Sequence, residues 1–130
     1  MAAAFVDKTE PASGVATSRT VKAPASTQVG QLVLVMVEVT GVAVTITMPA
    51  GWTKIGQVQN GALEVTTAAW FWRIATTKGA EEATISWGGA GLLSTAITAT
   101  YKGFDAEQPF AAVALESNGT ASTAMAFSAR

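Results

Sequence analysis

The sequence predicts an all-β, single-domain β-sandwich of the jelly-roll type, with eight or nine short antiparallel strands and an extended N-terminal arm. Short runs rich in Val, Ile and Thr recur at regular spacing and are separated by Gly, Pro and Asn, a pattern typical of sandwiches and closed barrels. No stretch favours an amphipathic helix. With 130 residues, of which 49% are hydrophobic, the chain has the length of one domain and enough apolar surface for a core.

The N-terminal segment differs in composition from the rest of the chain. We divide the chain into an arm or edge strand at residues 1–27 and a β-sandwich at residues 28–130. Residues 7–30 are small and polar and are interrupted by two prolines, as in extended surface segments. Weak alternation predicts one strand at residues 17–23. Two alternatives stay open: a surface strand with its loop, or an arm that docks on a neighbouring subunit.

The strongest strand signal is the β-branched run at residues 32–39. This run is too short for a typical helix, and we expect a central strand covered on both faces. Strict alternation at residues 42–48 predicts the next strand. The short Thr40-Gly41 link favours a hairpin between the two.

The next strands are separated by turn sequences. The turn at residues 49–51 contains Pro and Gly and is expected to place Trp52 against the core. A strand at residues 53–59 leads to Asn60-Gly61, a strong hairpin signal, and the following strand covers residues 62–76.

The strand at residues 62–76 contains a change of phase. Leu63 and Val65 share one face, whereas Trp70 and Trp72 share the other, so we expect a bulge at residues 66–69. The last strands are predicted at residues 83–87, 93–101, 110–115 and 122–127.

The composition argues against an enzyme. The chain has no His and no Cys, so it lacks the commonest general base, the thiol nucleophile and most transition-metal ligands. The nine acidic residues show no spacing that selects a catalytic pair. No calcium or phosphate-loop motif is present. We therefore expect no catalytic, cofactor-binding or metal-binding residues.

The charge and hydropathy patterns limit the classes of partner that we expect the chain to bind. A formal charge of −1 and a pI near 5.3 give no field that attracts polyanions, so nucleic acid is not expected as a partner. The longest strongly apolar run, residues 32–37, is shorter than the roughly 18 residues of a membrane span. The opening segment lacks the basic region of a secretion signal. We expect no membrane association.

The tryptophans are the residues best suited to binding. Trp70 and Trp72 share one face of a strand, and we expect that face to lie in the core or in a subunit interface. The alternative is a platform on which sugar rings stack. Trp52 is expected in the core.

Four segments carry a family resemblance: Gly30–Val35, Pro49–Thr53, Trp70–Ala75 and Tyr101–Asp105. They have the form of a Gly-x-Leu-Leu-Val strand, a Pro-x-Gly-Trp turn, an aromatic-x-Arg/Lys strand and a Tyr-x-Gly-x-Asp turn. In order and spacing they resemble a series found in bacteriophage virion proteins, and the resemblance covers about residues 28–110.

The resemblance implies a β-sandwich or jelly-roll protein on the phage particle. The short chain with its own Met favours a capsid decoration (cement) protein, which stabilises the shell by binding neighbouring major capsid proteins. Such a protein is expected as a homo-dimer or homo-trimer on the capsid exterior, made in the host bacterial cytoplasm. Arg19 and Lys22 would face an acidic capsid surface, or else be ordinary solvated charges. The alternative function is a carbohydrate- or receptor-binding module of a tail fibre or appendage.

Overall fold

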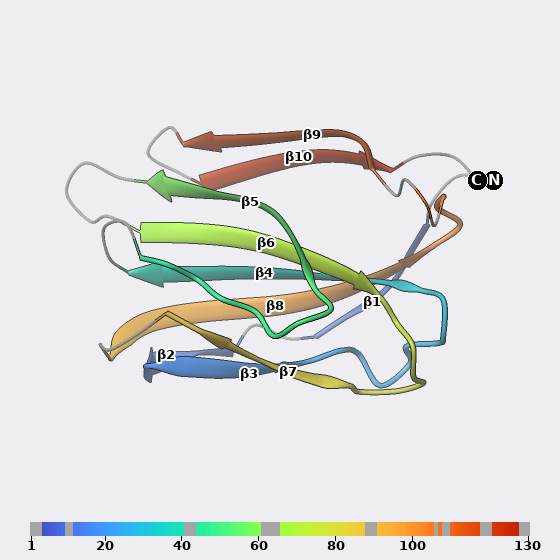
Figure 1. The fold of residues 1–130 in the computed structure, drawn as a ribbon, viewed down its shortest axis with the longest axis horizontal. Coiled ribbons are helices and arrows are strands. Elements are labelled where there is room, and N and C mark those ends of the chain that lie inside the picture. The colour runs from blue at the N-terminus through green and yellow to red at the C-terminus, as the bar shows by residue number, and fades with distance from the viewer. Residues whose placement is uncertain are drawn as a thin grey trace.

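The computed structural model describes residues 4–9, 12–40, 44–60, 66–87, 91–105, 107, 110–117 and 121–127. Within these residues the chain is all-β, with ten strands and no helix (Figure 1). The strands are β1 (Ala4–Lys8), β2 (Ala12–Ala16), β3 (Ser18–Lys22), β4 (Leu32–Thr40), β5 (Thr53–Asn60), β6 (Thr66–Ile74), β7 (Glu82–Ser86), β8 (Leu92–Lys102), β9 (Phe110–Ser117) and β10 (Ala121–Phe127).

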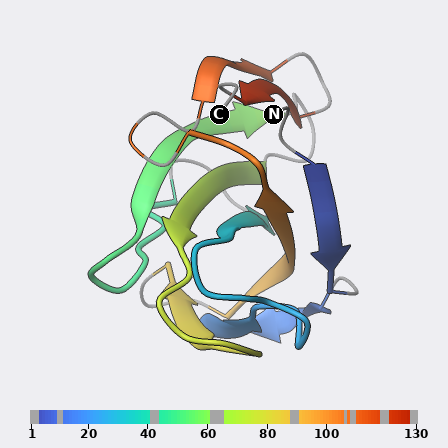
Figure 2. The same ribbon diagram turned by 90° about the vertical axis from the view of Figure 1, so that its right-hand side faces the viewer.

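The strands form one large sheet and two smaller pairs, all antiparallel. The large sheet has the order β1-β8-β4-β6-β5, and β2 also pairs with β8. The β3–β7 pair lies against one side of this curved sheet, and the β9–β10 hairpin lies on the other side (Figures 1 and 2). The arrangement is therefore sandwich-like.

The core fills the space between the large sheet and the β3–β7 pair. Successive side chains of a strand point to opposite faces, and the alternate valines of β4 are all buried on the inward face. Val21 of β3 and Ile85 of β7 meet them from the opposite layer, and Phe71 joins them from β6. The prediction of a central strand at residues 32–39 is confirmed, because β4 pairs with strands on both of its edges.

The inward face of β8 carries small side chains, and their hydroxyls bind the N-terminal strands. The Thr98 hydroxyl donates to the Lys22 carbonyl oxygen at 2.7 Å, and the Thr9 and Thr98 hydroxyl oxygens lie 2.8 Å apart. The Arg19 Nε–H donates to the Ser94 hydroxyl at 3.0 Å. These bonds satisfy polar groups that would be costly to bury unpaired. The buried inward residues are Ser94, Ala96, Thr98 and Thr100.

The N-terminal segment is built into the same body. Strands β1 and β2 pair with β8, β3 pairs with β7, and Val21 and Ala23 are buried. Residues 4–8, 12–16 and 18–22 therefore form strands of the chain's own sheets. This agrees with the alternative of a surface strand and not with an extended arm.

Two predicted hairpins differ from the structure. The hairpin between residues 32–39 and 42–48 is wrong, because β6 and β8 occupy both edges of β4. Residues 44–48 instead approach β7 through a bridge between Thr47 and Ser86. The predicted pairing of residues 53–59 with the following strand is confirmed. Asn60 lies opposite Thr66, however, so the link is longer than a two-residue turn.

The predicted bulge at residues 66–69 is wrong. β6 keeps an unbroken register with β4 from Thr66 to Ile74. The irregularity lies in β5, between Lys54 and Gly56. Leu63 and Val65, on which the change of phase depended, lie outside the described residues.

Asp7 ties β1 to the loop that follows β3. The Ser26 hydroxyl donates to Asp7 Oδ2 at 2.6 Å, and the backbone N–H of Lys8 donates to Oδ1 at 2.8 Å. Both bonds favour the charged carboxylate and hold the pKa of Asp7 below its ordinary value of 3.8.

This lowered pKa predicts a pH dependence. A carboxyl group whose pKa falls on folding contributes stability above its unfolded-state pKa of about 4, and that contribution is lost as the pH falls through the folded-state value. We expect Asp7→Asn to melt at a lower temperature than the unsubstituted protein at pH 6. The difference should shrink as the pH falls below about 4. Thermal unfolding followed by circular dichroism measures it, and a pH-independent difference would contradict the assignment.

Candidate functional site

The ionisable side chains are scattered over the described part of the chain. No group of three or more Asp and Glu side chains that could hold a metal ion occurs among the described residues. Two ion pairs are formed there, Lys22 with Glu82 and Arg73 with Glu81, both at 3.1 Å. The same residues include no helix long and apolar enough to cross a membrane.

Arg19 is used within the chain. Its guanidinium is half-buried and donates to the Ser94 hydroxyl at 3.0 Å and to the Gly14 carbonyl oxygen at 3.1 Å. Gly14 has a φ of 152°, a backbone conformation that favours glycine. Arg19 therefore links β2, β3 and β8.

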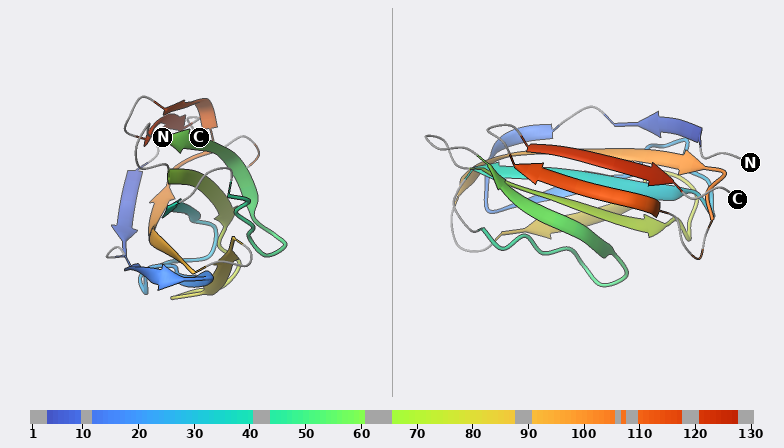
Figure 3. Two further views of the ribbon diagram at one scale, coloured as in Figure 1. Left: turned by 90° about the vertical axis from the view of Figure 1, so that its left-hand side faces the viewer. Right: turned by 90° about the horizontal axis from the view of Figure 1, so that it is seen from above.

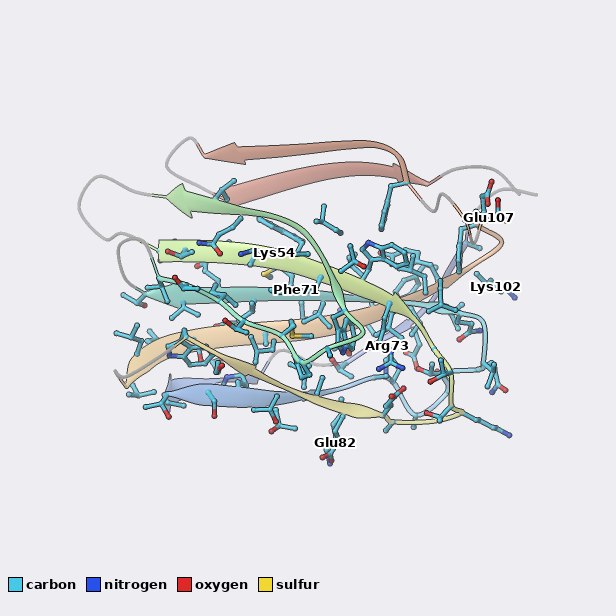
Figure 4. All side chains as sticks on the ribbon, in the orientation of Figure 1. Lys54, Phe71, Arg73, Glu82, Lys102 and Glu107 are labelled. Carbon is cyan, nitrogen blue, oxygen red and sulfur yellow. The ribbon has the colours of Figure 1, made fainter. Side chains whose placement is uncertain are left out.

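Lys22 lies on an exposed polar surface on the outward side of the β3–β7 pair. The Thr20 and Thr84 hydroxyl oxygens are 2.9 Å apart, and Lys22 Nζ lies 3.1 Å from Glu82 Oε1. Figure 4 shows Glu82 pointing away from the body of the protein. We call this surface the polar face. Its cross-strand pairs are Ser18 with Ser86, Thr20 with Thr84, and Lys22 with Glu82.

The sequence reasoning missed the polar face, although a signal was present. Residues 82–86 alternate polar residues with Ala83 and Ile85, and the polar positions are the exposed ones in the structure. In residues 18–22 the exposed positions are also polar, although Arg19 takes the place of an apolar residue in the alternation. The same alternation puts Arg19 on the buried side with Val21 and puts Lys22 on the exposed side.

The tryptophans do not form a solvent-facing row. Trp70 is only 6% exposed. Trp72, on the same face of β6, is half-buried and meets the Phe110 ring edge-on, with the centroids 5.8 Å apart. Trp87 is buried, and Trp52 is half-buried against the core. Stacking of sugar rings requires open ring faces, and this pair of tryptophans offers little open surface.

Arg73 organises the end of β6 through contacts to three residues. Its guanidinium lies 5.5 Å from the centroid of the Trp52 ring and bonds the Glu81 carboxylate and the Thr76 hydroxyl. The Thr77 hydroxyl donates to the other Glu81 oxygen at 3.2 Å. The cluster, near the label of Arg73 in Figure 4, fixes the connection between β6 and β7. The Arg73 guanidinium therefore contacts both the Glu81 carboxylate and the Trp52 ring within the chain.

The polar face can bind another molecule through complementary shape and hydrogen bonds. The polar face is rigid because both of its strands are paired and its exposed side chains bond across the pair. Such a face suits contact with another protein surface. No protein-family model, no curated protein and no solved structure matches this chain.

Proposed function

We propose that this chain is a non-enzymatic virion structural protein, a bacteriophage capsid decoration protein that stabilises the shell by binding neighbouring major capsid proteins. Two kinds of support combine. One is the sequence resemblance to phage virion proteins over residues 28–110. The other, which carries the most weight, is the order in which the strands pair.

The strand pairs are nested, as in a long hairpin that has been rolled up. β2 pairs with β8, β3 with β7, and β4 with β6. Residues 44–48 and β5 lie innermost in this nest, and the Gln57 side chain of β5 donates to the Val44 carbonyl oxygen at 2.9 Å. This order supports an eight-stranded jelly roll, to which β1 and the β9–β10 hairpin are additions. Jelly rolls occur in viral capsid and lectin domains, so the link to a virion is an analogy of fold.

We place the shell-binding surface on the polar face. A decoration protein must stay dispersed until it meets a completed shell, so its binding surface should be polar and preformed. The polar face meets both conditions, and its Lys22 side chain is 62% exposed. Arg19, expected from the sequence as a second capsid contact, is bonded inside the chain and is not part of this proposal.

The alternative function is a carbohydrate- or receptor-binding module of a tail fibre or appendage. The jelly-roll order is equally compatible with a lectin. This alternative depends on open aromatic rings, and the burial of Trp70 and the packing of Trp72 against Phe110 weaken it. The decoration function is therefore the better supported of the two.

Co-sedimentation with expanded, undecorated capsids tests the proposed function. We expect the purified protein to pellet with such capsids. Thr84→Glu adds a negative charge at the centre of the polar face and should weaken binding by at least about tenfold, through repulsion from an acidic shell. Thr53→Glu places the same change at an exposed threonine of β5 and should bind as the unsubstituted protein does.

Two outcomes would count against the proposal. If the unsubstituted protein stays in the supernatant, the decoration function is refuted. If Thr84→Glu and Thr53→Glu bind equally well, the shell contacts a surface other than the polar face.

A further inference from the structure

The outward side of β8 and its neighbours forms a second surface, which is largely apolar. The inward residues of β8 are buried against the core, so the alternate residues face outward. Register pairs extend this surface onto β4 on one side and onto β1 and β2 on the other. We call it the open face. Its main apolar members are Leu34, Met36, Leu93, Ile97, Ala99 and Tyr101.

The β9–β10 hairpin lies on the same outward side of the large sheet and covers the part formed by β5 and β6, where Ala68 and Trp70 are buried (Figure 3). It lies beside β5 and touches Trp72 through Phe110, so the accessible part of the open face is the part formed by β8, β1 and β2. On the side away from the hairpin, three large apolar side chains are more than half exposed: Phe5, Val15 and Leu93. Val15 lies opposite Leu93 at one end of β8, and Phe5 lies opposite Tyr101 at the other end, so exposed apolar side chains lie at both ends of the open face. Exposed apolar surface of this kind marks interaction sites.

The edges of the large sheet discourage association by strand addition. β1 has a register shift between Phe5 and Asp7, directly before the exposed Lys8. β5 has a shift between Lys54 and Gly56, and Lys54 is exposed. Bulges and lysines on edge strands are devices that prevent edge-to-edge pairing. Association is therefore favoured through a face of the sheet over its edges.

Two charges on the open face are arranged for self-recognition. Lys8 of β1 is in register with Ala99, and Glu38 of β4 is in register with Thr95. β8 lies between these two strands, so Ile97 is midway between the charges, which are about 16 Å apart by strand spacing and rise. Neither Lys8 nor Glu38 forms an ion pair with another described residue.

We infer that the open face binds a second copy of this chain across a two-fold axis that lies in the interface at Ile97. An axis perpendicular to the line from Lys8 to Glu38 places Lys8 of each copy over Glu38 of the other. A two-fold interface requires this reciprocity. The strands of the two sheets would then cross at roughly 70°, near the orthogonal class of sheet packing.

The dimensions of the open face predict a reversible dimer. It spans roughly 26 Å along the strands and 14 Å across them, so a dimer would bury about 700 Å² in total, which is the size of a weak, transient contact. We expect a dissociation constant on the order of 10–100 μM. This inference does not depend on the shell-binding proposal, because it concerns the free protein and a different surface.

Sedimentation equilibrium between about 1 and 500 μM tests the inference, together with a charge exchange. Lys8→Glu and Glu38→Lys each replace two attractive contacts per dimer with two repulsive ones and should each weaken association by at least about tenfold. The double substitution restores opposite charges and should return the constant to within about threefold of the original. Lys54→Glu, on the far edge of the sheet, is the matched control and should have no effect.

Any of the following outcomes would overturn the inference. The unsubstituted protein must dimerise, so a monomer at every concentration excludes the interface. A double variant no stronger than the single ones shows that Lys8 and Glu38 do not meet. If Lys8→Glu abolishes capsid co-sedimentation while the unsubstituted protein is monomeric, the open face binds the shell and not a second copy. Circular dichroism and a thermal melt confirm that each variant is folded.

Discussion

Deletion of residues 1–22 is expected to abolish cooperative folding. The deletion removes β1, β2 and β3, so β7 loses the strand with which it pairs and the valines of β4 lose much of their cover. Burial of one Val or Ile side chain contributes about 1.5–3 kcal/mol, and a whole domain is stable by only about 5–15 kcal/mol. The deletion exposes several such residues and removes Val21 itself, so the summed loss of burial free energy exceeds the stability of the domain.

The result can be read from a urea titration and from the dispersion of amide signals in an NMR spectrum. We expect the truncated chain to show no sigmoidal transition and little dispersion. Deletion of residues 1–8 is the graded control, because it removes only the edge strand β1 and should leave a folded but less stable protein. A folded 23–130 fragment would contradict the assignment of the N-terminal strands to the body of the fold.

Trp87→Ala is expected to destabilise the protein by about 3–5 kcal/mol, as for other large buried aromatics. The Trp87 side chain is only 4% exposed and belongs to the core between the large sheet and the β3–β7 pair. Its indole N–H donates to the Ala16 carbonyl oxygen at 3.0 Å, so the ring also holds the end of β2. Truncation removes both the packing and the hydrogen bond.

Two further variants separate these contributions. Trp87→Phe keeps an aromatic ring but leaves the Ala16 carbonyl without that donor, so it should cost about 1–3 kcal/mol. Val29→Ala changes a mostly exposed side chain and should stay within about 0.5 kcal/mol. Urea titrations at one protein concentration measure the free energies, because the proposed dimerisation would make them concentration-dependent. A loss below about 1 kcal/mol for Trp87→Ala would place the ring outside the core.

Local sequence signals predicted strands better than they predicted pairing. The run at residues 32–39 is so rich in β-branched residues that a central strand followed from it directly. Residues 42–48 alternate just as clearly, yet among the described residues 44–48 the pairing is a single bridge between Thr47 and Ser86, because distant strands fill both edges of β4. The nested pairs join segments far apart in the chain, such as β2 and β8, and no short-range pattern encodes those contacts.

The two proposed binding surfaces also depend on contacts between segments that are far apart in the chain. Alternation along a strand puts the half-buried Arg19 and the exposed Lys22 on opposite faces, yet the expectation from the sequence placed both of them against the capsid. The exposed side of a single strand can be predicted from alternation. The pairing that joins β3 to β7 in the polar face, and β1 and β4 to β8 in the open face, comes only from tertiary folding. Lys8 and Glu38, for example, share a face only because β8 lies between their strands.

A cryo-electron microscopy reconstruction of expanded, undecorated capsids incubated with the protein tests the central claim most directly. We predict additional density on the capsid exterior into which the fold fits with the β3–β7 pair against the shell, and with the open face turned away from it. Capsids without added density, or a fit in which the polar face points into solvent, would contradict the account.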